Sequence, residues 1–289
     1  MAALSLLACA CLPDTELSVP LQENRLTATI GDASSTKTTL TPEEDGVSRV
    51  LWSENDKIGV FVDGQDGIYS YHLKEGAGTK RAVFAGFGQG ATYIAVYPYS
   101  ETTGLSGENV SLILPSEQNY CVGTFESGSY PMVAVSNTSQ LSFRNLCSVL
   151  KVSMTGHHKV TSLVFRPNDE SVKVAGPATV SLSNPDDPLL TVSQEGCDSL
   201  VLNVGSLLLN DETPTDFYLV LPAQTYKGGF TVRVNTSTGY MDKKLNTDVT
   251  LARARKYDAK PFAVKLDYGV EPSMSLSGKG TEKAAARPQ

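Results

Sequence analysis

Few residues of this chain have types and spacing that could do chemistry, and the first is a cysteine near the N-terminus. Cys9 follows Leu6-Leu7-Ala8, the pattern of a bacterial lipobox whose cysteine thiol takes a lipid. No Lys or Arg precedes Cys9, so either the leader is truncated or the match is accidental. Cys11 is a poorer acceptor. Because the apolar run is far shorter than the roughly 18 residues of a transmembrane helix, we expect lipid anchoring without a membrane span.

The three histidines offer little for catalysis. The adjacent His157 and His158 point in different directions in a strand or tight turn, so a hairpin tip explains them better than chelation. His72 lies in an alternating segment, which favours a surface or core-edge position over a general base. The chain has neither a G-x-S-x-G nor an H-E-x-x-H motif. We therefore expect no enzyme activity, no catalytic residue, no metal site and no cofactor.

Two glycine-containing segments superficially suggest ligand loops. Asp63–Gly67 begins like a calcium loop but lacks the carboxylate at its far end, so a hairpin turn is the better interpretation. Gly86–Gly90 lacks the Lys-Ser/Thr ending of a phosphate loop and precedes a strand rather than a helix. We interpret it as a flexible connection.

Charge and cysteine content exclude further classes of function. The net charge is -7, and Lys and Arg nowhere cluster with aromatic residues, so we expect no nucleic-acid partner. Cys121, Cys147 and Cys197 lack CxxC spacing and nearby histidine, which argues against a zinc site or a disulfide framework. Cys147, in an apolar run, is typical of a buried small hydrophobic residue.

Short segments with apolar residues at every second position, separated by turn residues, predict an all-β chain. The expected strands are 26–30, 47–51, 57–62, 68–73, 82–84, 92–97, 110–114, 150–154, 160–165, 178–182, 199–204, 217–221, 230–235, 243–251 and 262–268. The length suggests two β-sandwiches with a seam near Gly156. The predicted organisation is a signal and linker (1–24), an N-terminal sandwich (25–156), a C-terminal sandwich (157–270) and a flexible tail (271–289).

Several segments, in their order along the chain, are each similar to an element of one family. They are Thr36–Thr38 followed by 50–61 (VLWSENDKIGVF), Ala95–Tyr99, Tyr130–Ala134, Leu141–Val152 (LSFRNLCSVLKV), Ala175–Ala178, Leu221–Ala223 and Gly228–Val232. Together they resemble the fimbrillin family (Mfa-like, type V pilins) of Bacteroidetes surface lipoproteins. The resemblance implies two tandem transthyretin-like β-sandwich domains, a lipid-anchored location at the cell outer membrane, and assembly with other fimbrial subunits.

In polymerising members of this family an Arg-specific protease removes the first strand, and a strand from another subunit fills the groove. The resemblance implies Leu26, Ala28 and Ile30 as candidates for the displaced strand. Arg25 and Arg49 are the processing candidates. Arg25 is slightly favoured, since a cut at Arg49 would also strip Thr36–Thr38; an ordinary linker arginine is the alternative interpretation of Arg25.

The donor strand is harder to assign. Val264, Leu266, Tyr268 and Val270 alternate, and they suit either the last strand of the second domain or a donor. The segment after them is short and polar, which favours a tip, anchor or accessory role, or a protein that never polymerises, over a main-shaft role. Asp198-Ser199-Leu200 also resembles an O-glycosylation motif of these bacteria, with chance as the alternative.

A different class of function is an outer-surface glycan-binding lipoprotein. It needs an exposed aromatic platform, and Trp52, Tyr97 and Tyr99 are its candidates. A single tryptophan between two strands is more typical of a core. Burial of Trp52 and Tyr97 would count heavily against this alternative.

Overall fold

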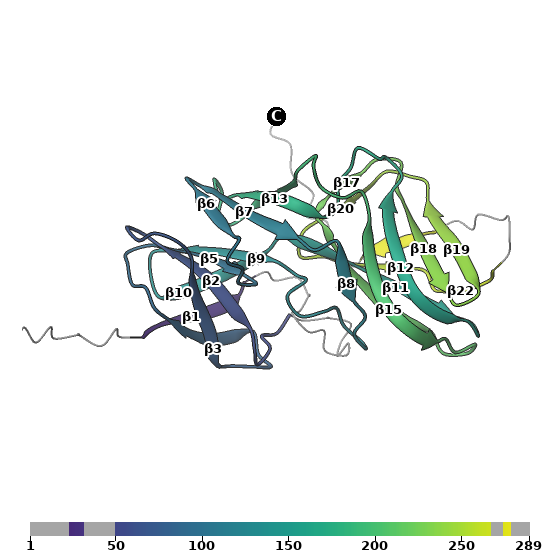
Figure 1. Ribbon diagram of the computed structural model, residues 1–289, viewed down its shortest axis with the longest axis horizontal. Coiled ribbons are helices and arrows are strands. Elements are labelled where there is room, and N and C mark those ends of the chain that lie inside the picture. Colours follow the sequence, from purple (N-terminus) through teal and green to yellow (C-terminus); the bar gives the residue numbers. More distant parts are fainter. Residues whose placement is uncertain (1–22, 32–49, 267–273, 279–289) are drawn as a thin grey trace, which may run out of the picture.

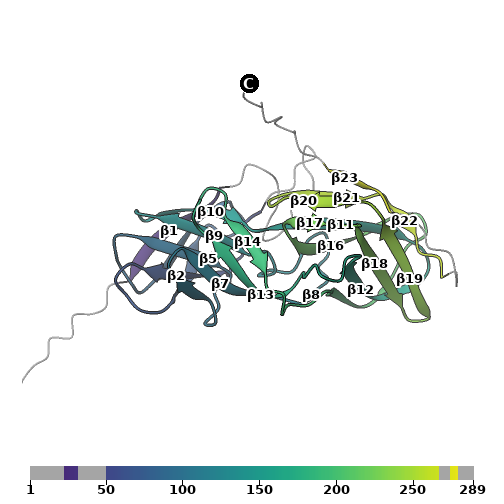
Figure 2. The same ribbon diagram turned by 90° about the horizontal axis from the view of Figure 1, so that it is seen from above.

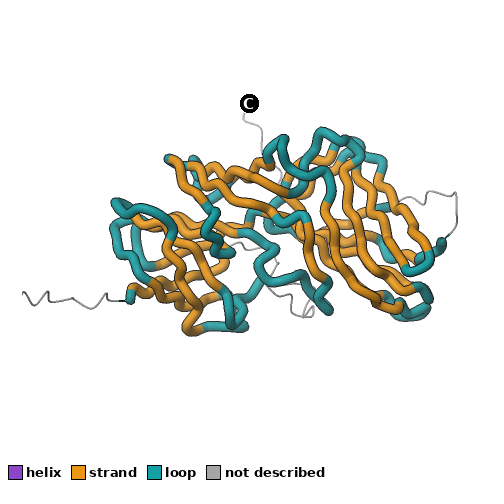
Figure 3. The backbone as a smooth tube through the Cα atoms, in the orientation of Figure 1, coloured by secondary structure: helices purple, strands orange, loops and turns teal. Residues whose placement is uncertain are grey.

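The protein is built from strands, loops and turns (Figure 3). The computed structural model describes residues 23–31, 50–266 and 274–278, and these contain no helix. The strands form two groups that follow one another along the long axis of the molecule (Figure 1). The prediction of an all-β, sandwich-like chain is confirmed; the transthyretin-like character of each half stays a prediction.

The first group is a closed barrel of strands that are mostly distant in sequence. In sheet order its strands are β1 (Asn24–Ile30), β10 (Gln140–Asn145), β9 (Met132–Ser136), β5 (Tyr93–Tyr97), β2 (Lys57–Val62), β3 (Tyr69–Glu75) and β4 (Arg81–Gly86). Apolar residues alternate along these strands because one face of each lines the barrel interior. The predicted strand 57–62 has the observed bounds of β2.

A smaller sheet packs against this barrel. Its order is β14 (Leu189–Val192), β13 (Gly176–Ser181), β7 (Asn109–Leu114) and β6 (Gly104–Ser106). Val110, Leu112 and Val180 on its inner face belong to the same hydrophobic core as the barrel interior. Barrel and sheet together make the first of the two groups.

The second group is a sandwich of two larger sheets, seen as separate layers in Figure 2. One sheet contains β16 (Thr215–Pro222), β11 (Cys147–Thr155), β21 (Lys256–Ala259) and β23 (Leu276–Gly278), with β22 (Phe262–Ala263) also on β11. The other runs β19 (Gly239–Leu245), β18 (Phe230–Thr236), β12 (Lys159–Pro167), β15 (Leu200–Leu208) and β8 (Glu117–Asn119). A two-stranded sheet joins β17 (Gln224–Tyr226) to β20 (Val249–Leu251).

The two cores meet at β11. Cys147 and Val149 belong to the first core, whereas Leu150 and later apolar residues of β11 belong to the second. Gly156 lies in the turn between β11 and β12. The division of the chain into domains at this glycine stays a prediction.

Three predicted strands are divided, shortened or missing in the structure, and the predicted set lacks several observed strands, among them β9, β10 and β14. The predicted strand 243–251 is two strands, since β19 ends at Leu245 and β20 pairs with β17 instead. Asp248 lies between β19 and β20, and its carboxylate accepts a hydrogen bond from Gly228 N–H at 2.7 Å. Of 262–268, β22 contains Phe262 and Ala263, and of 47–51 the described residues are not in a strand.

Candidate functional site

The first strand of the barrel has the alternation that the sequence predicts. Leu26, Ala28 and Ile30 point inward and are at most 4% exposed, whereas Thr27 and Thr29 point outward and are half-buried. β-Branched residues at the outward positions favour the extended backbone. All three displaced-strand candidates therefore belong to the buried face of β1.

β1 closes the barrel because it lies between two other strands. It runs antiparallel to β4, where Leu26 pairs with Phe84 and Ala28 with Ala82. On its other side it runs parallel to β10, where Ala28 pairs with Leu141. Figure 1 shows β1 in purple, as the colour bar gives for the start of the described chain. Without β1, both neighbouring strands would present unpaired backbone N–H and C=O groups.

Further backbone hydrogen bonds hold the end of β1. Ile30 N–H donates to the carbonyl of Lys80 at 3.0 Å, and Gly31 N–H donates to the carbonyl of Phe143 at 2.9 Å. The strand is thus bonded along both edges. It fills a groove that has two backbone walls and an apolar floor.

Trp52 joins the two walls of this groove from inside the barrel. Its ring makes edge-to-face contacts with Phe84 of β4 at 5.0 Å and with Phe143 of β10 at 5.4 Å, measured between ring centroids. A third such contact reaches Tyr97 of β5 at 5.5 Å. Pairs of this geometry stabilise beyond their buried area. Trp52 follows β1 in the chain. Its contacts with Phe84 and Phe143 therefore lie within one polypeptide even if the chain is cut between β1 and Trp52.

A buried carboxylate fixes the loop that carries Trp52. Asp56 accepts hydrogen bonds from Ser53 N–H at 2.7 Å, from the Tyr97 hydroxyl at 2.8 Å and from the Ser127 hydroxyl at 3.3 Å. Burial raises the pKa of Asp56, and these hydrogen bonds oppose that rise. Burial also raises the pKa of Tyr97 far above its usual range. The network anchors the Trp52 loop to β5.

The aromatic platform expected for a glycan-binding protein is not formed by these residues. Trp52 and Tyr97 are each 1% exposed and lie in the first core, and Tyr99 is half-buried. Their rings are used in packing, so the interpretation of Trp52 and Tyr97 as a sugar platform was wrong. The physical reason is that Trp52 fills the barrel interior.

Arg25 lies inside β1 rather than before it. Its backbone is in register with Ala85 of β4, and its side chain lies 3.2 Å from the Glu75 carboxylate. Both side chains are largely exposed. A cut after Arg25 would leave Leu26–Ile30 in the groove. Arg49 and Cys9 lie outside the described residues.

The described donor-strand candidates already have places in the second group. Val264 is buried in its core and donates its N–H to the carbonyl of Thr155 at 2.9 Å. Leu266 packs against the same core. Tyr268 and Val270 lie outside the described residues. After that gap, Met274 is buried and Leu276 begins β23 on the edge of β21.

The remaining sequence candidates do not converge. His72 is exposed and lies 3.3 Å from the Ser70 hydroxyl. His157 and His158 sit at a hairpin tip, as predicted, but the expectation that they point in different directions was wrong, since their tilted rings are in contact with centroids 4.4 Å apart. Ser199 is half-buried just before β15. Within the described parts of the chain, no three His, Cys, Asp or Glu side chains are grouped to hold a metal, and no helix is long and apolar enough to cross a membrane.

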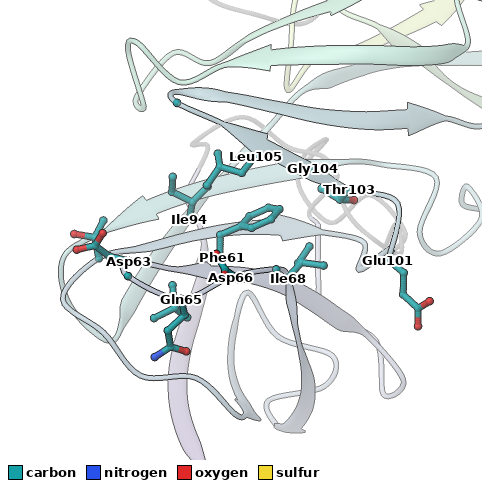
Figure 4. A pocket seen from close by; sticks show the side chains of 15 residues that line it. Phe61, Asp63, Gln65, Asp66, Ile68, Ile94, Glu101, Thr103, Gly104 and Leu105 are labelled. Carbon is teal, nitrogen blue, oxygen red and sulfur yellow. The ribbon is translucent and has the colours of Figure 1, made fainter.

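A cavity of about 680 Å³ lies outside the barrel, between the turn after β2 and the hairpin of β6 and β7. Figure 4 shows its apolar side chains, Phe61, Ile68, Ile94 and Leu105, with Asp63 and Glu101 at opposite ends. The turn Asp63–Gly67 connects β2 to β3, which confirms the predicted hairpin. Sequence reasoning did not find this cavity, because its walls come from three separate segments.

Sequence reasoning also missed the walls of the β1 groove as parts of one site. Ala82 and Phe84 come from β4, and Leu141 and Phe143 come from β10. Alternation predicted a strand at 82–84, but it did not predict β10, whose residues entered only through the family resemblance. Nothing in that pattern identifies β1 as the strand they both flank.

Comparison with known proteins rests on structure alone, since no protein-family model and no curated protein matches the sequence. A solved candidate cell adhesion protein from Bacteroides ovatus is 10% identical, with a TM-score of 0.54 over 91% of this chain and 98% of that one. One from Bacteroides uniformis is 15% identical, with a TM-score of 0.48 over 89% and 98%. The C-terminally truncated tip fimbrial protein Mfa3 from Porphyromonas gingivalis is 10% identical, with a TM-score of 0.37 over 89% and 98%.

At these identities a likeness shows the fold, and of the three the first has the TM-score to carry that argument. It extends over nearly the whole of both chains. The protein therefore shares its fold with the Bacteroides ovatus protein.

Proposed function

We propose that this protein is a non-enzymatic fimbrial or adhesion subunit of the bacterial surface, whose first strand is exchanged for a strand of another subunit. The observation that carries the proposal is the position of β1 between β4 and β10. A terminal strand with two strand neighbours leaves a groove with two open edges when it departs. An extended segment gains main-chain hydrogen bonds on both sides in such a groove.

The names of the structural neighbours agree with this role. Two are candidate cell adhesion proteins, and one is a fimbrial tip protein. The fold shared with the Bacteroides ovatus protein and the fimbrillin motifs support a surface location, with a lipid on Cys9 as the anchor. The partners are other fimbrial subunits, and a tip, anchor or accessory position suits the chain better than the main shaft.

The position of β1 favours Arg49 over Arg25 as the processing site. Release of β1 requires a cut after Ile30, and Arg49 is the first arginine beyond it. A cut there leaves Trp52 in the remaining chain, so the contacts with Phe84 and Phe143 keep the groove walls together. β1 then stays in place by noncovalent contacts until another strand replaces it.

The test is limited digestion of the full chain with an Arg-specific protease, followed by N-terminal sequencing and native mass spectrometry. We expect a new N-terminus at Val50, with residues up to 49 still bound. Arg49→Gln should prevent this cut, whereas Arg25→Gln should not.

Assembly is tested by adding candidate partner subunits to the cleaved chain. We expect β1 to leave as the mass of a mixed complex appears. Two results would contradict the proposal. One is that the chain unfolds after cleavage at Arg49, and the other is that the cleaved monomer retains β1 in the presence of every partner subunit tested.

A further inference from the structure

We infer that the β1 groove selects its incoming strand by size, taking the order large apolar, small, large apolar at alternate positions. Residues 263–278 of a second copy are then excluded as the incoming strand, because they lack that order. The inference rests on the strand-exchange function proposed above. It adds which strand the groove accepts.

The middle of the groove is occupied by the smallest side chain of the buried face. Ala28 is 0% exposed and is in register with Ala82 on one side and with Leu141 on the other, both of them buried. Residues directly opposite one another on neighbouring strands have Cβ atoms about 5 Å apart. A longer side chain at this position must therefore enter the barrel interior.

Trp52 occupies the interior at this level. It contacts Phe84, which pairs with Leu26, and Phe143, which pairs with Ile30. Ala28 lies between Leu26 and Ile30 on the buried face of β1. Because the indole contacts the partners of both flanking residues, we infer that it also lies over Ala28. Protein interiors are close-packed, and added methylenes there force neighbours off their preferred positions.

A second restriction follows at the end of the strand. A Cβ placed on Gly31 would lie 2.3 Å from the Ser142 hydroxyl oxygen and 3.1 Å from a guanidinium nitrogen of Arg144. That arginine is held by the carbonyl of Gly31 at 3.2 Å and by Asp186 at 2.6 Å. A residue other than glycine would turn the exposed Ser142 side chain and shift the end of Arg144, so this restriction is smaller than the one at Ala28.

The C-terminal segment of this chain does not have the required order. Its alternating residues Val264, Leu266, Tyr268 and Val270 are all large, so every window of three places a large side chain at the middle. Reversal of the strand does not change this. The second alternating set, Met274 and Leu276 before Gly278, again has a large residue where Ala28 stands.

The experiment uses the full chain cleaved by the Arg-specific protease and fluorescent synthetic peptides that compete with β1. The reference peptide is residues 24–31, NRLTATIG. Its variant NRLTLTIG carries the Ala28→Leu change, and the matched control NRLTALIG carries the same leucine at the outward position of Thr29. A fourth peptide, AVKLDYGV, is residues 263–270.

We expect the Ala28→Leu peptide to bind at least about tenfold more weakly than the reference, and the Thr29→Leu peptide to bind within about threefold. The C-terminal peptide should not displace β1. Trp52→Phe in the cleaved chain should reduce the difference in affinity between the reference peptide and the Ala28→Leu peptide, because the smaller ring leaves space beside position 28. In the intact chain, Ala28→Leu should lower the melting temperature and Thr29→Leu should not.

Equal binding of the reference and Ala28→Leu peptides, or displacement of β1 by the C-terminal peptide, would overturn size selection while strand exchange stood. An intact Ala28→Leu chain as stable as Thr29→Leu would also overturn it, independently of processing. Failure of every peptide, including the reference, to exchange would overturn the strand-exchange function and this inference with it.

Discussion

The two groups of strands hold their terminal strands in different ways. β1 of the first group has a strand on each side, whereas β23 of the second group lies at the edge of its sheet with β21 as its strand neighbour. Loss of β1 would leave two rows of unpaired backbone groups, and loss of β23 would leave one. The first arrangement makes a receiving groove, and the second makes an ordinary edge.

The second group protects another edge with a side chain. Gln118 of β8 donates its amide N–H to the carbonyl of Val220 at 2.9 Å and accepts the N–H of Val220 at 3.0 Å. Val220 lies on β16, the end strand of its sheet. A buried amide thus takes the place of a strand at this point, which limits pairing with another chain.

The largest expected effect tests the difference between the terminal strands. Leu26→Ala should lower the free energy of unfolding by about 3 kcal/mol, because it opens a cavity beneath a fully enclosed strand. Leu276→Ala on the half-buried edge strand should cost less than about 1.5 kcal/mol. Urea unfolding followed by circular dichroism measures both.

Fluorescence of Trp52, the single tryptophan, reports the first group separately. We expect Leu26→Ala to shift that transition and Leu276→Ala to leave it unchanged. Equal losses from the two variants would remove the distinction between an enclosed and an edge strand.

The next prediction tests whether the Gln118 side chain protects the outer edge of β16 through its hydrogen bonds to Val220. Gln118→Leu should destabilise by about 2 kcal/mol, because it leaves the N–H and C=O of Val220 buried without partners. The exposed neighbour Glu117→Ala is the control and should change stability by less than about 0.5 kcal/mol. Thermal unfolding by calorimetry compares them, and similar melting temperatures for the two variants would contradict this role of Gln118.

The two groups should also respond to pH with opposite signs. Burial raises the folded-state pKa of Asp56 above its ordinary 3.8, so its contribution to stability is fully present below 3.8 and is lost as the pH rises through the folded value. The Arg233 guanidinium, bonded to Asp242 at 2.7 and 2.8 Å, lowers the pKa of that carboxyl. Its contribution is fully present above 3.8 and is lost as the pH falls through the folded value.

Asp56→Asn and Asp242→Asn should each remove one of these dependences. The pH profile of each variant is subtracted from that of the unaltered protein, with Trp52 fluorescence reporting the first group. We expect Asp242→Asn to cost at most about 1 kcal/mol near neutral pH, because Arg233 is partly exposed. Difference profiles of the same sign would contradict the assignment.

The smallest effect concerns the exposed pair on β1. The Arg25 and Glu75 side chains are 59% and 65% exposed, so Arg25→Gln should change stability by less than about 0.5 kcal/mol. Urea unfolding followed by Trp52 fluorescence measures this. A loss comparable to that of Leu26→Ala would show that Arg25 anchors β1, and the enclosed apolar face would no longer explain its retention.

The sequence by itself determined most of the strands and the buried face of β1. The period of two in Leu26, Ala28 and Ile30 follows from the pleat, which sends successive side chains to opposite sides. The same pattern predicted most strands of both groups. It did not find the break at Asp248, since the alternation continues across it.

Only the tertiary structure decided which strands are neighbours. Backbone hydrogen bonds carry no sequence preference, and the cost of closing a loop rises slowly with its length, so alternation cannot show that β1 pairs with β4 and β10. The same holds for Trp52, whose burial between Phe84 and Phe143 depends on that pairing. The receiving groove is therefore a property of the closed barrel, although the alternation of β1 and of residues 82–84 was already apparent in the sequence.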